Sequence, residues 1–213
     1  MAINPGVIAR TGLELLGETG LDGLTMRLVA DRLGVRPPTL YWHVKNKQHL
    51  LDAMAAVMFT DAIEGLRPPA DAAAWPDWVA TRARTLRKVL LRYRDGARVF
   101  AGTYLTGPDL PAAMELTLRV LLDAGFTLPD AARGFAAVLH YTVGHTIEEQ
   151  ARLGAGYEHN PYDPKALAEA FRPDLYPLAA RAATEVFLGP DPDTDFDAGL
   201  DYILTGMAAK AGL

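Results

Sequence analysis

Apolar residues recur at helical spacing along most of the chain, and runs that alternate in the manner of β-strands are nearly absent. Near the N-terminus, an apolar stripe predicts a helix over residues 6–18 that Gly20 ends. Further helices are expected at 75–92, 95–101, 109–124, 129–152, 164–188 and 195–211. Pro173 and Pro177 indicate that the 164–188 segment is broken or begins late. The pattern predicts an all-α fold.

Residues 25–43 have the order of a helix-turn-helix motif. Thr25 is a suitable N-cap for a helix over Met26–Leu33, and Gly34 tolerates the positive φ that a tight turn requires. A second helix is expected over Pro38–His43. The turn is flanked by the small and apolar residues that two steeply crossing helices need, namely Ala30, Leu33 and Val35.

The chain divides at the helix that follows this motif. Asn46 can cap a long helix from Lys47 to about Ile63, and the stretch 65–74 (GLRPPADAAA) is a loop. We therefore predict three parts: a helix-turn-helix domain over 1–46, a connecting helix over 47–64, and a larger helical domain over 65–213.

Composition narrows the class of protein. Half of the 213 residues are apolar and none is cysteine, which excludes disulfides and thiolate metal sites. Neither a signal-peptide pattern nor a membrane-spanning apolar run is present, so a cytoplasmic protein is expected. The net charge is −5, yet the first fifty residues carry six Lys or Arg and four Asp or Glu. A basic N-terminal domain on an acidic body suits a protein that contacts phosphate at one end, although an imbalance this small also arises by chance.

The stretch PTLYWHVKNK (38–47) combines aromatic and basic residues at the end of the motif. A helix in the major groove of DNA presents side chains to base edges and phosphates together, which suits Thr39, Tyr41, Trp42 and His43. Lys47, at the start of the next helix, can reach a phosphate. The alternative is that the aromatic residues and Leu40 form a small core while the lysines stay in solvent; for Leu40 the core is expected.

Several blocks resemble one known family. The segment Leu21–Leu51 (LDGLTMRLVADRLGVRPPTLYWHVKNKQHLL) is similar to the DNA-binding domain of the TetR family, and TLYWHVKNK is typical of its tetracycline-repressor branch. Leu90–Thr103 (LLRYRDGARVFAGT) and Ala124-Gly-Phe126, followed by His140 and Glu148, resemble the ligand-binding domain of that branch. The resemblance implies an all-α homodimer, without enzymatic activity or a cofactor, that represses transcription until a small molecule binds.

The resemblance also implies which residues contact a double-stranded operator. They are Arg27, Pro38, Thr39, Tyr41, Trp42, His43 and Lys47. Arg27 is the best candidate for bidentate recognition of guanine. The tetracycline repressors have a glutamine where this chain has Pro37, so a different operator sequence is expected.

The ligand-binding positions depart from those of the tetracycline repressors. Phe100 stands where their histidine ligates the drug's magnesium, and a phenyl ring cannot ligate a metal. Their asparagine, phenylalanine, second histidine and glutamine correspond to Arg82, Leu86, Ile63 and Leu116 or Thr117, whereas Thr103 and Glu148 remain. We therefore expect an inducer other than magnesium–tetracycline.

An apolar cavity with few polar groups is expected instead. Its candidate lining is Leu86, Phe100, Tyr104, Leu105, Leu116, Val120, Leu139 and Val143, with Arg82, Thr103, His140 and Glu148 as polar groups. Simple core packing is the alternative for each aliphatic residue. Arg82 is either a surface arginine or, if it faces the cavity, a residue that favours an acidic or carbonyl-bearing ligand.

The sequence offers little support for a metal site or an enzymatic site. His140 and His145 invite a zinc site, but residues five apart on a helix diverge by about 140°, so no metal is expected; His145 and Glu149 can share a face. No pair of side chains suggests a nucleophile with its base.

The alternatives to an inducible repressor are a helical small-molecule-binding protein and an activator or architectural DNA-binding protein without an inducer.

The expected mechanism uses the connecting helix as a lever. A ligand that prefers one arrangement of the body changes the separation of two DNA-binding domains, which must lie roughly 34–36 Å apart to occupy successive major grooves. Gly96 is a candidate relay, and the last two expected helices, 164–188 and 195–211, suit a four-helix dimer interface.

Overall fold

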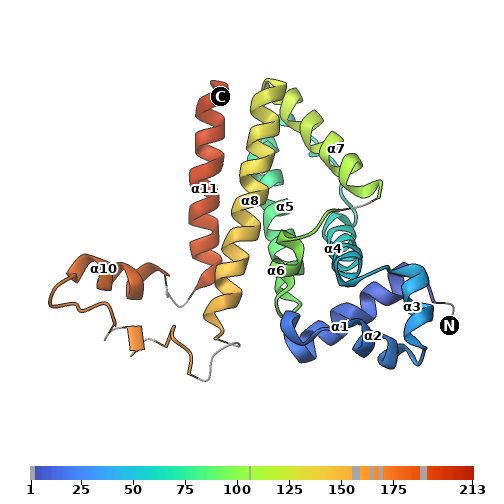
Figure 1. The fold of residues 1–213 in the computed structure, drawn as a ribbon. Coiled ribbons are helices and arrows are strands. Elements are labelled where there is room, and N and C mark those ends of the chain that lie inside the picture. The colour runs from blue at the N-terminus through green and yellow to red at the C-terminus, as the bar shows by residue number, and fades with distance from the viewer. Residues whose placement is uncertain (1–2, 106, 155–158, 164–165, 168–169, 188–190) are drawn as a thin grey trace.

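The computed structural model describes residues 3–105, 107–154, 159–163, 166–167, 170–187 and 191–213. This part of the chain is helical and contains no β-strand, so the predicted all-α class is confirmed (Figure 1). The N-terminal domain consists of α1 (Pro5–Gly23), α2 (Met26–Leu33) and α3 (Pro37–His43). Helix α4 (Lys47–Ile63) connects this domain to the body. The described elements of the body are, in chain order, a 3-10 turn (Ala72–Ala74), α5 (Trp75–Leu91), α6 (Gly96–Ala101), α7 (Asp109–Asp123), α8 (Leu128–Arg152), α10 (Pro177–Ala182), a π turn (Ala183–Phe187) and α11 (Pro192–Ala211).

Local capping produces the helix-turn-helix as its sequence predicts. The side chains of Thr25 and Asn46 each accept a hydrogen bond from the N–H three residues onward, at 3.2 Å and 2.9 Å. Gly34 has a φ of 67° and ends α2. The first helix is longer than predicted: Gly20, with a φ of 69°, kinks α1, which then runs on to Gly23.

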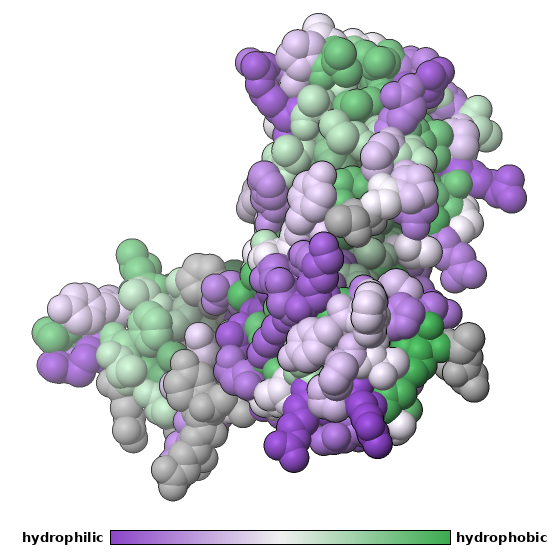
Figure 2. Space-filling model, turned by 45° about the vertical axis from the view of Figure 1, so that its right-hand side comes forward, coloured by the Kyte–Doolittle hydropathy of each residue, from purple (hydrophilic) through white to green (hydrophobic). Residues whose placement is uncertain are grey.

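The expected helix over 164–188 is interrupted. Pro177 is the first residue of α10, and residues 171–176 before it form turns. Figure 1 shows that α10 lies on an arm that projects from the body, and Figure 2 shows hydrophobic side chains (green) on this arm. Leu175 and Leu178 on the arm are exposed.

Two apolar clusters hold the described chain together. One joins α1–α4 to α5 and α6, and its largest buried side chains include Ile8, Leu16 and Met58. The other joins α5, α7, α8 and α11 around Phe196 and Leu121. The last helix packs along α8, and the expected use of the 164–188 and 195–211 segments in a dimer interface stays a prediction. No helix in the described residues is both long and apolar enough to cross a membrane.

Candidate functional site

The exposed face of α3 is unusually aromatic. Leu40 is the one residue of this helix that is buried, as expected. Tyr41 is 47% exposed and Trp42 is 87% exposed, and Pro38, Thr39 and His43 are exposed as well. The alternative that the aromatic residues form a core is therefore wrong. An exposed indole on a short helix without acidic residues is suited to a surface that contacts another molecule.

The basic side chains around α3 differ in their exposure to solvent and in their partners within the chain. The Arg27 side chain is 87% exposed, and its Nε lies 3.9 Å from an Asp31 carboxylate oxygen. Lys47 is half-buried, and its Nζ donates to the Leu21 carbonyl oxygen at 2.9 Å. This contact turns the ammonium group toward α1, so the arrangement does not present Lys47 to a phosphate. Arg36 and Lys45, at the two ends of α3, are exposed, and the sequence analysis did not select them.

A cavity lies between α4, α5, α7 and α8, with Met207 of α11 at one side. It encloses about 720 Å³ of empty space, part of which is open to solvent. Three polar side chains line it, namely Arg82, Thr117 and Thr142. The rest of the lining is apolar and consists of Phe59, Ala62, Ile63, Leu66, Trp78, Val79, Ala83, Leu86, Ala113, Leu121, Phe135, Val138, Leu139 and Met207. A largely apolar lining with a few polar groups is typical of small-molecule sites.

The structure brings four of the eleven predicted ligand residues to this cavity, namely Ile63, Arg82, Leu86 and Thr117. The guanidinium Nε of Arg82 is shielded from solvent and has no hydrogen-bond partner among the described residues. Thr117 donates its hydroxyl hydrogen to the Ala113 carbonyl oxygen at 2.8 Å. Arg82 is therefore no ordinary surface arginine.

The other seven predicted residues do not line the cavity. Phe100 stacks on the lining residue Phe59, with ring centroids 6.5 Å apart. Val143 is buried in the apolar cluster that joins α1–α4 to α5 and α6. Thr103 donates its hydroxyl to the Phe100 carbonyl oxygen at 2.9 Å, and Tyr104 is 77% exposed. The remaining three lie on other helical faces: Leu116 on α7, and His140 and Glu148 on the solvent side of α8.

Twelve lining residues escaped the sequence analysis, namely Phe59, Ala62, Leu66, Trp78, Val79, Ala83, Ala113, Leu121, Phe135, Val138, Thr142 and Met207. Four of them, Phe59, Trp78, Phe135 and Thr142, each stand three or four residues from a correctly predicted position on the same helix, as Phe59 does from Ile63 and Trp78 from Arg82. Extending each correct position by one helical turn would have found them. Of the additional apolar candidates, Leu139 lines the cavity, whereas Leu105 and Val120 do not.

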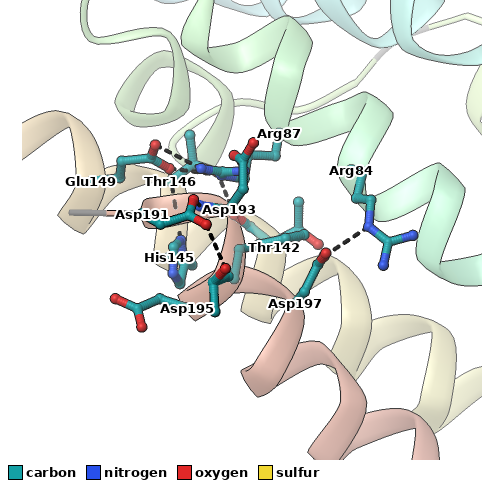
Figure 3. Close-up of polar contacts among 12 residues, drawn as sticks. Arg84, Arg87, Thr142, His145, Thr146, Glu149, Asp191, Asp193, Asp195 and Asp197 are labelled. Atoms are coloured by element: carbon teal, nitrogen blue, oxygen red, sulfur yellow. Dashed lines mark hydrogen bonds and ion pairs between the residues drawn. The ribbon is translucent and has the colours of Figure 1, made fainter. Parts of the chain in front are cut away.

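An ionic cluster around the buried Arg87 ties α5 to α8 and α11 (Figure 3). Arg87 is 5% exposed and binds both carboxylate oxygens of Glu149, at 2.7 and 2.8 Å. It also donates to Asp193 at 2.6 Å, and its guanidinium carbon lies 5.0 Å from the Phe196 ring centroid. Burial alone would lower the pKa of Arg87, but the hydrogen bonds to Glu149 and Asp193 outweigh it and raise the pKa.

His145 and Glu149 share a face of α8, as their spacing predicts, with 3.8 Å between the nearest nitrogen and oxygen. Burial lowers the pKa of His145, and the neighbouring carboxylate only partly offsets this effect. Among the described residues, no group of three or more His, Cys, Asp or Glu side chains is placed to hold a metal ion.

The N-terminal domain is fastened to the body at Leu21. The Leu21 N–H donates to Asp95 Oδ2 at 2.9 Å, while Lys47 binds the Leu21 carbonyl oxygen. Asp95 is the N-cap of α6 and adopts a φ of 57°. Gly96 follows it without a positive φ; a Cβ there would collide with the Leu90 carbonyl oxygen, so close packing, rather than an unusual φ, requires this glycine.

A helix-turn-helix domain joined by one helix to a body with a cavity defines a ligand-responsive transcriptional regulator. Two family models match the chain: "Bacterial regulatory proteins, tetR family" over residues 8–54 and "Tetracyclin repressor-like, C-terminal domain" over residues 68–211. The chain belongs to the TetR family, whose members are DNA-binding regulators and not enzymes.

Relatives of the chain include both tetracycline repressors and other regulators. The tetracycline repressor protein class A from transposon 1721 of Escherichia coli is 39% identical over 98% of this chain and 92% of its own length. A possible TetR family regulator from Streptomyces coelicolor A3(2) is 40% identical, with a TM-score of 0.84 over 97% of this chain and 99% of that one.

Two solved complexes differ in their likeness to this fold. The Streptomyces coelicolor TetR family protein ActR in complex with actinorhodin has a TM-score of 0.82 at 29% identity, covering 100% of this chain and 99% of that one. TetR class A in complex with 5a,6-anhydrotetracycline and magnesium has a lower TM-score, 0.72, at 34% identity, covering 97% of this chain and 99% of that one.

Proposed function

We propose that this chain is a homodimeric, cytoplasmic repressor that leaves a palindromic operator when a largely apolar small molecule other than magnesium–tetracycline enters the cavity. The observation that carries the proposal is the lining of the cavity. It contains no carboxylate and no imidazole among the described residues, but it does contain the guanidinium of Arg82. A magnesium chelate would meet no metal ligand there, and a cationic side chain would repel it.

The α3 surface is proposed as the part that enters the major groove. Its exposed Thr39, Tyr41, Trp42 and His43 stand next to exposed basic residues, and Arg27 is free to extend toward a base edge. Arg36 and Lys45 join the proposed phosphate contacts. Lys47 keeps a proposed role only if DNA draws its ammonium group away from Leu21.

The connecting helix supplies the proposed route from ligand to DNA. Near its C-terminal end, α4 contributes Phe59, Ala62 and Ile63 to the cavity wall, whereas its first residue, Lys47, holds Leu21 of the N-terminal domain. These two ends are about 24 Å apart along the helix axis. A ligand that shifts the cavity end of α4 therefore changes the separation of two such domains in a dimer.

The test begins with selection of preferred duplexes from random DNA at two salt concentrations. We expect an inverted repeat, with an affinity that falls steeply as salt rises because phosphate contacts release counterions. Failure to enrich any sequence at low salt would contradict the proposal. Adding tetracycline with magnesium should leave the complex intact, and release at micromolar drug would overturn the proposed class of inducer.

Two matched variants locate the DNA-contacting surface. Arg27→Ala should weaken binding to the selected operator about 10-fold or more, because a bidentate arginine–guanine contact contributes about 1–3 kcal/mol. Arg119→Ala is the control, since Arg119 is also an exposed arginine paired with an acid four residues away, but it lies on α7. Equal effects of the two substitutions on operator affinity, measured by titration, would argue against a specific role for Arg27.

A further inference from the structure

The middle of α5 carries an arginine without a counter-ion. Arg82 lines the apolar cavity between Trp78 and Leu86, which lie one helical turn to either side of it. No ion pair joins Arg82 to a carboxylate in the described part of the chain, and its Nε has no hydrogen-bond partner there. The side chain is half-buried in an apolar lining, and a partly buried charge without a carboxylate partner suits the binding of an anion.

The other polar groups of the lining are already committed as donors. Thr142 donates its hydroxyl to the Val138 carbonyl oxygen at 2.7 Å, and Thr117 donates to Ala113. The indole N–H of Trp78 donates to the Arg67 carbonyl oxygen at 2.6 Å. The threonine oxygens can therefore accept hydrogen bonds, whereas Arg82 is the group in the described lining that offers uncommitted donors and a positive charge.

We propose that the cavity selects a ligand with a largely hydrocarbon, aromatic body and one carboxylate, and that Arg82 binds this carboxylate. The proposal rests on the cavity being the effector site. The rings of Phe59, Trp78 and Phe135 provide apolar walls for the body, and the guanidinium fork matches carboxylate geometry. A neutral molecule of the same shape leaves the arginine unpaired, and a cation is repelled.

The binding experiment compares an acid with its neutral isostere. Anthracene-9-carboxylate and anthracene-9-carboxamide are titrated by calorimetry into the wild-type protein, Arg82→Met and Arg82→Lys. We expect the wild-type protein to prefer the acid about 10- to 100-fold, as a charge-assisted hydrogen bond implies. Arg82→Met should abolish this preference, and Arg82→Lys should retain part of it because the charge remains.

A control substitution on the same helix separates a local effect from a general change in charge. Arg84→Met removes an exposed arginine that pairs with Asp197 outside the cavity, and it should leave the acid preference unchanged. Equal affinity of the wild-type protein for acid and amide, or a preference that survives Arg82→Met, overturns the proposal. So does a failure of the acid to bind at millimolar concentration.

Operator binding by the wild-type protein, measured without acid, distinguishes this failure from a failure of the proposed function. If DNA binding is intact and the acid preference is absent, the regulator stands and only the ligand class is wrong. A ligand-free measurement adds a second test. Arg82→Met should raise the melting temperature by about 2–4 °C, because it removes an unpaired charge. A fall in the melting temperature would show that Arg82 has a structural role and contradict the proposal.

Discussion

Two arginines on one helix illustrate how burial gives the same residue type different roles. Arg82 and Arg87 both lie on α5; Arg87 is buried, whereas Arg82 is half-buried and only its Nε is shielded from solvent. Arg87 forms ion pairs with Glu149 and Asp193, so its charge is neutralised by carboxylates within the body. Arg82 has no such partner among the described residues, and we assign its charge to a ligand.

The Arg87 cluster predicts a large loss of stability on substitution. Arg87→Met should lower the free energy of unfolding by about 3 kcal/mol, because it leaves the mostly buried Glu149 without its cation. Urea denaturation measures this change. Arg84→Met, which breaks an exposed pair, should cost less than about 1 kcal/mol. A similarly small loss for Arg87→Met would mean that Glu149 finds water or another partner.

Lys47 of α4 and Asp95 at the start of α6 both bind the N-terminal domain at one residue, Leu21. Leu21 is held by Asp95 through its N–H and by Lys47 through its carbonyl oxygen. The kink at Gly20 breaks the helical hydrogen-bond pattern at this point, so the Leu21 N–H donates to Asp95 and not to a carbonyl oxygen one turn earlier in the helix. A rearrangement of α6 should therefore displace Leu21 and, with it, the DNA-binding domain.

Removing the Asp95 carboxylate tests this junction. Asp95→Ala should accelerate hydrogen exchange at the Leu21 amide about 10-fold, because a charge-assisted hydrogen bond to that amide is lost. The measurement is amide exchange followed by NMR. Asp61→Ala is the control, since it breaks an ion pair between α4 and Arg10 of α1 without touching Leu21. Unchanged exchange in Asp95→Ala would show that the amide is protected by packing alone.

Helices α8 and α11 present an outer surface that no other described part of the chain covers. Exposed positions on α8 recur every three or four residues, at Arg133, Ala137, His140, Gly144 and Glu148. Gly144 and, on α11, Gly206 have open space where a Cβ would stand. Small residues allow helices to approach closely, so we expect a second copy of the chain to pack here as a four-helix interface.

A bulky residue on this surface should prevent dimer formation. Gly206→Arg fits the isolated chain but obstructs a partner helix, so light scattering should report 23.0 kDa where the wild-type protein reports twice that mass. Gly17→Arg is the matched control, because Gly17 is also an exposed helical glycine with open space around it, but it lies on α1. A dimeric Gly206→Arg protein would place the interface elsewhere.

Features that depend on neighbouring residues could be predicted from the sequence alone. The 3.6-residue period, the caps Thr25 and Asn46 and the left-handed Gly34 specified most of the helices and the helix-turn-helix. The motif residues of α3 also predicted which side chains face outward, since Leu40 alone had to complete a small core. These signals act within one or two helical turns, so they can be recognised without knowing the fold.

Contacts between residues on different helices of the body could not be predicted from the sequence, because they depend on how the helices pack. The lining of the cavity depends on how α4, α5, α7 and α8 are rotated against one another, and a rotation of one residue, about 100°, separates Leu116 from Thr117 and His140 from Leu139. Arg87 meets Glu149 across 62 positions of sequence and Asp193 across 106. The contact between Lys47 and Leu21 could not be predicted for the same reason, because the two residues are close in space and distant along the chain.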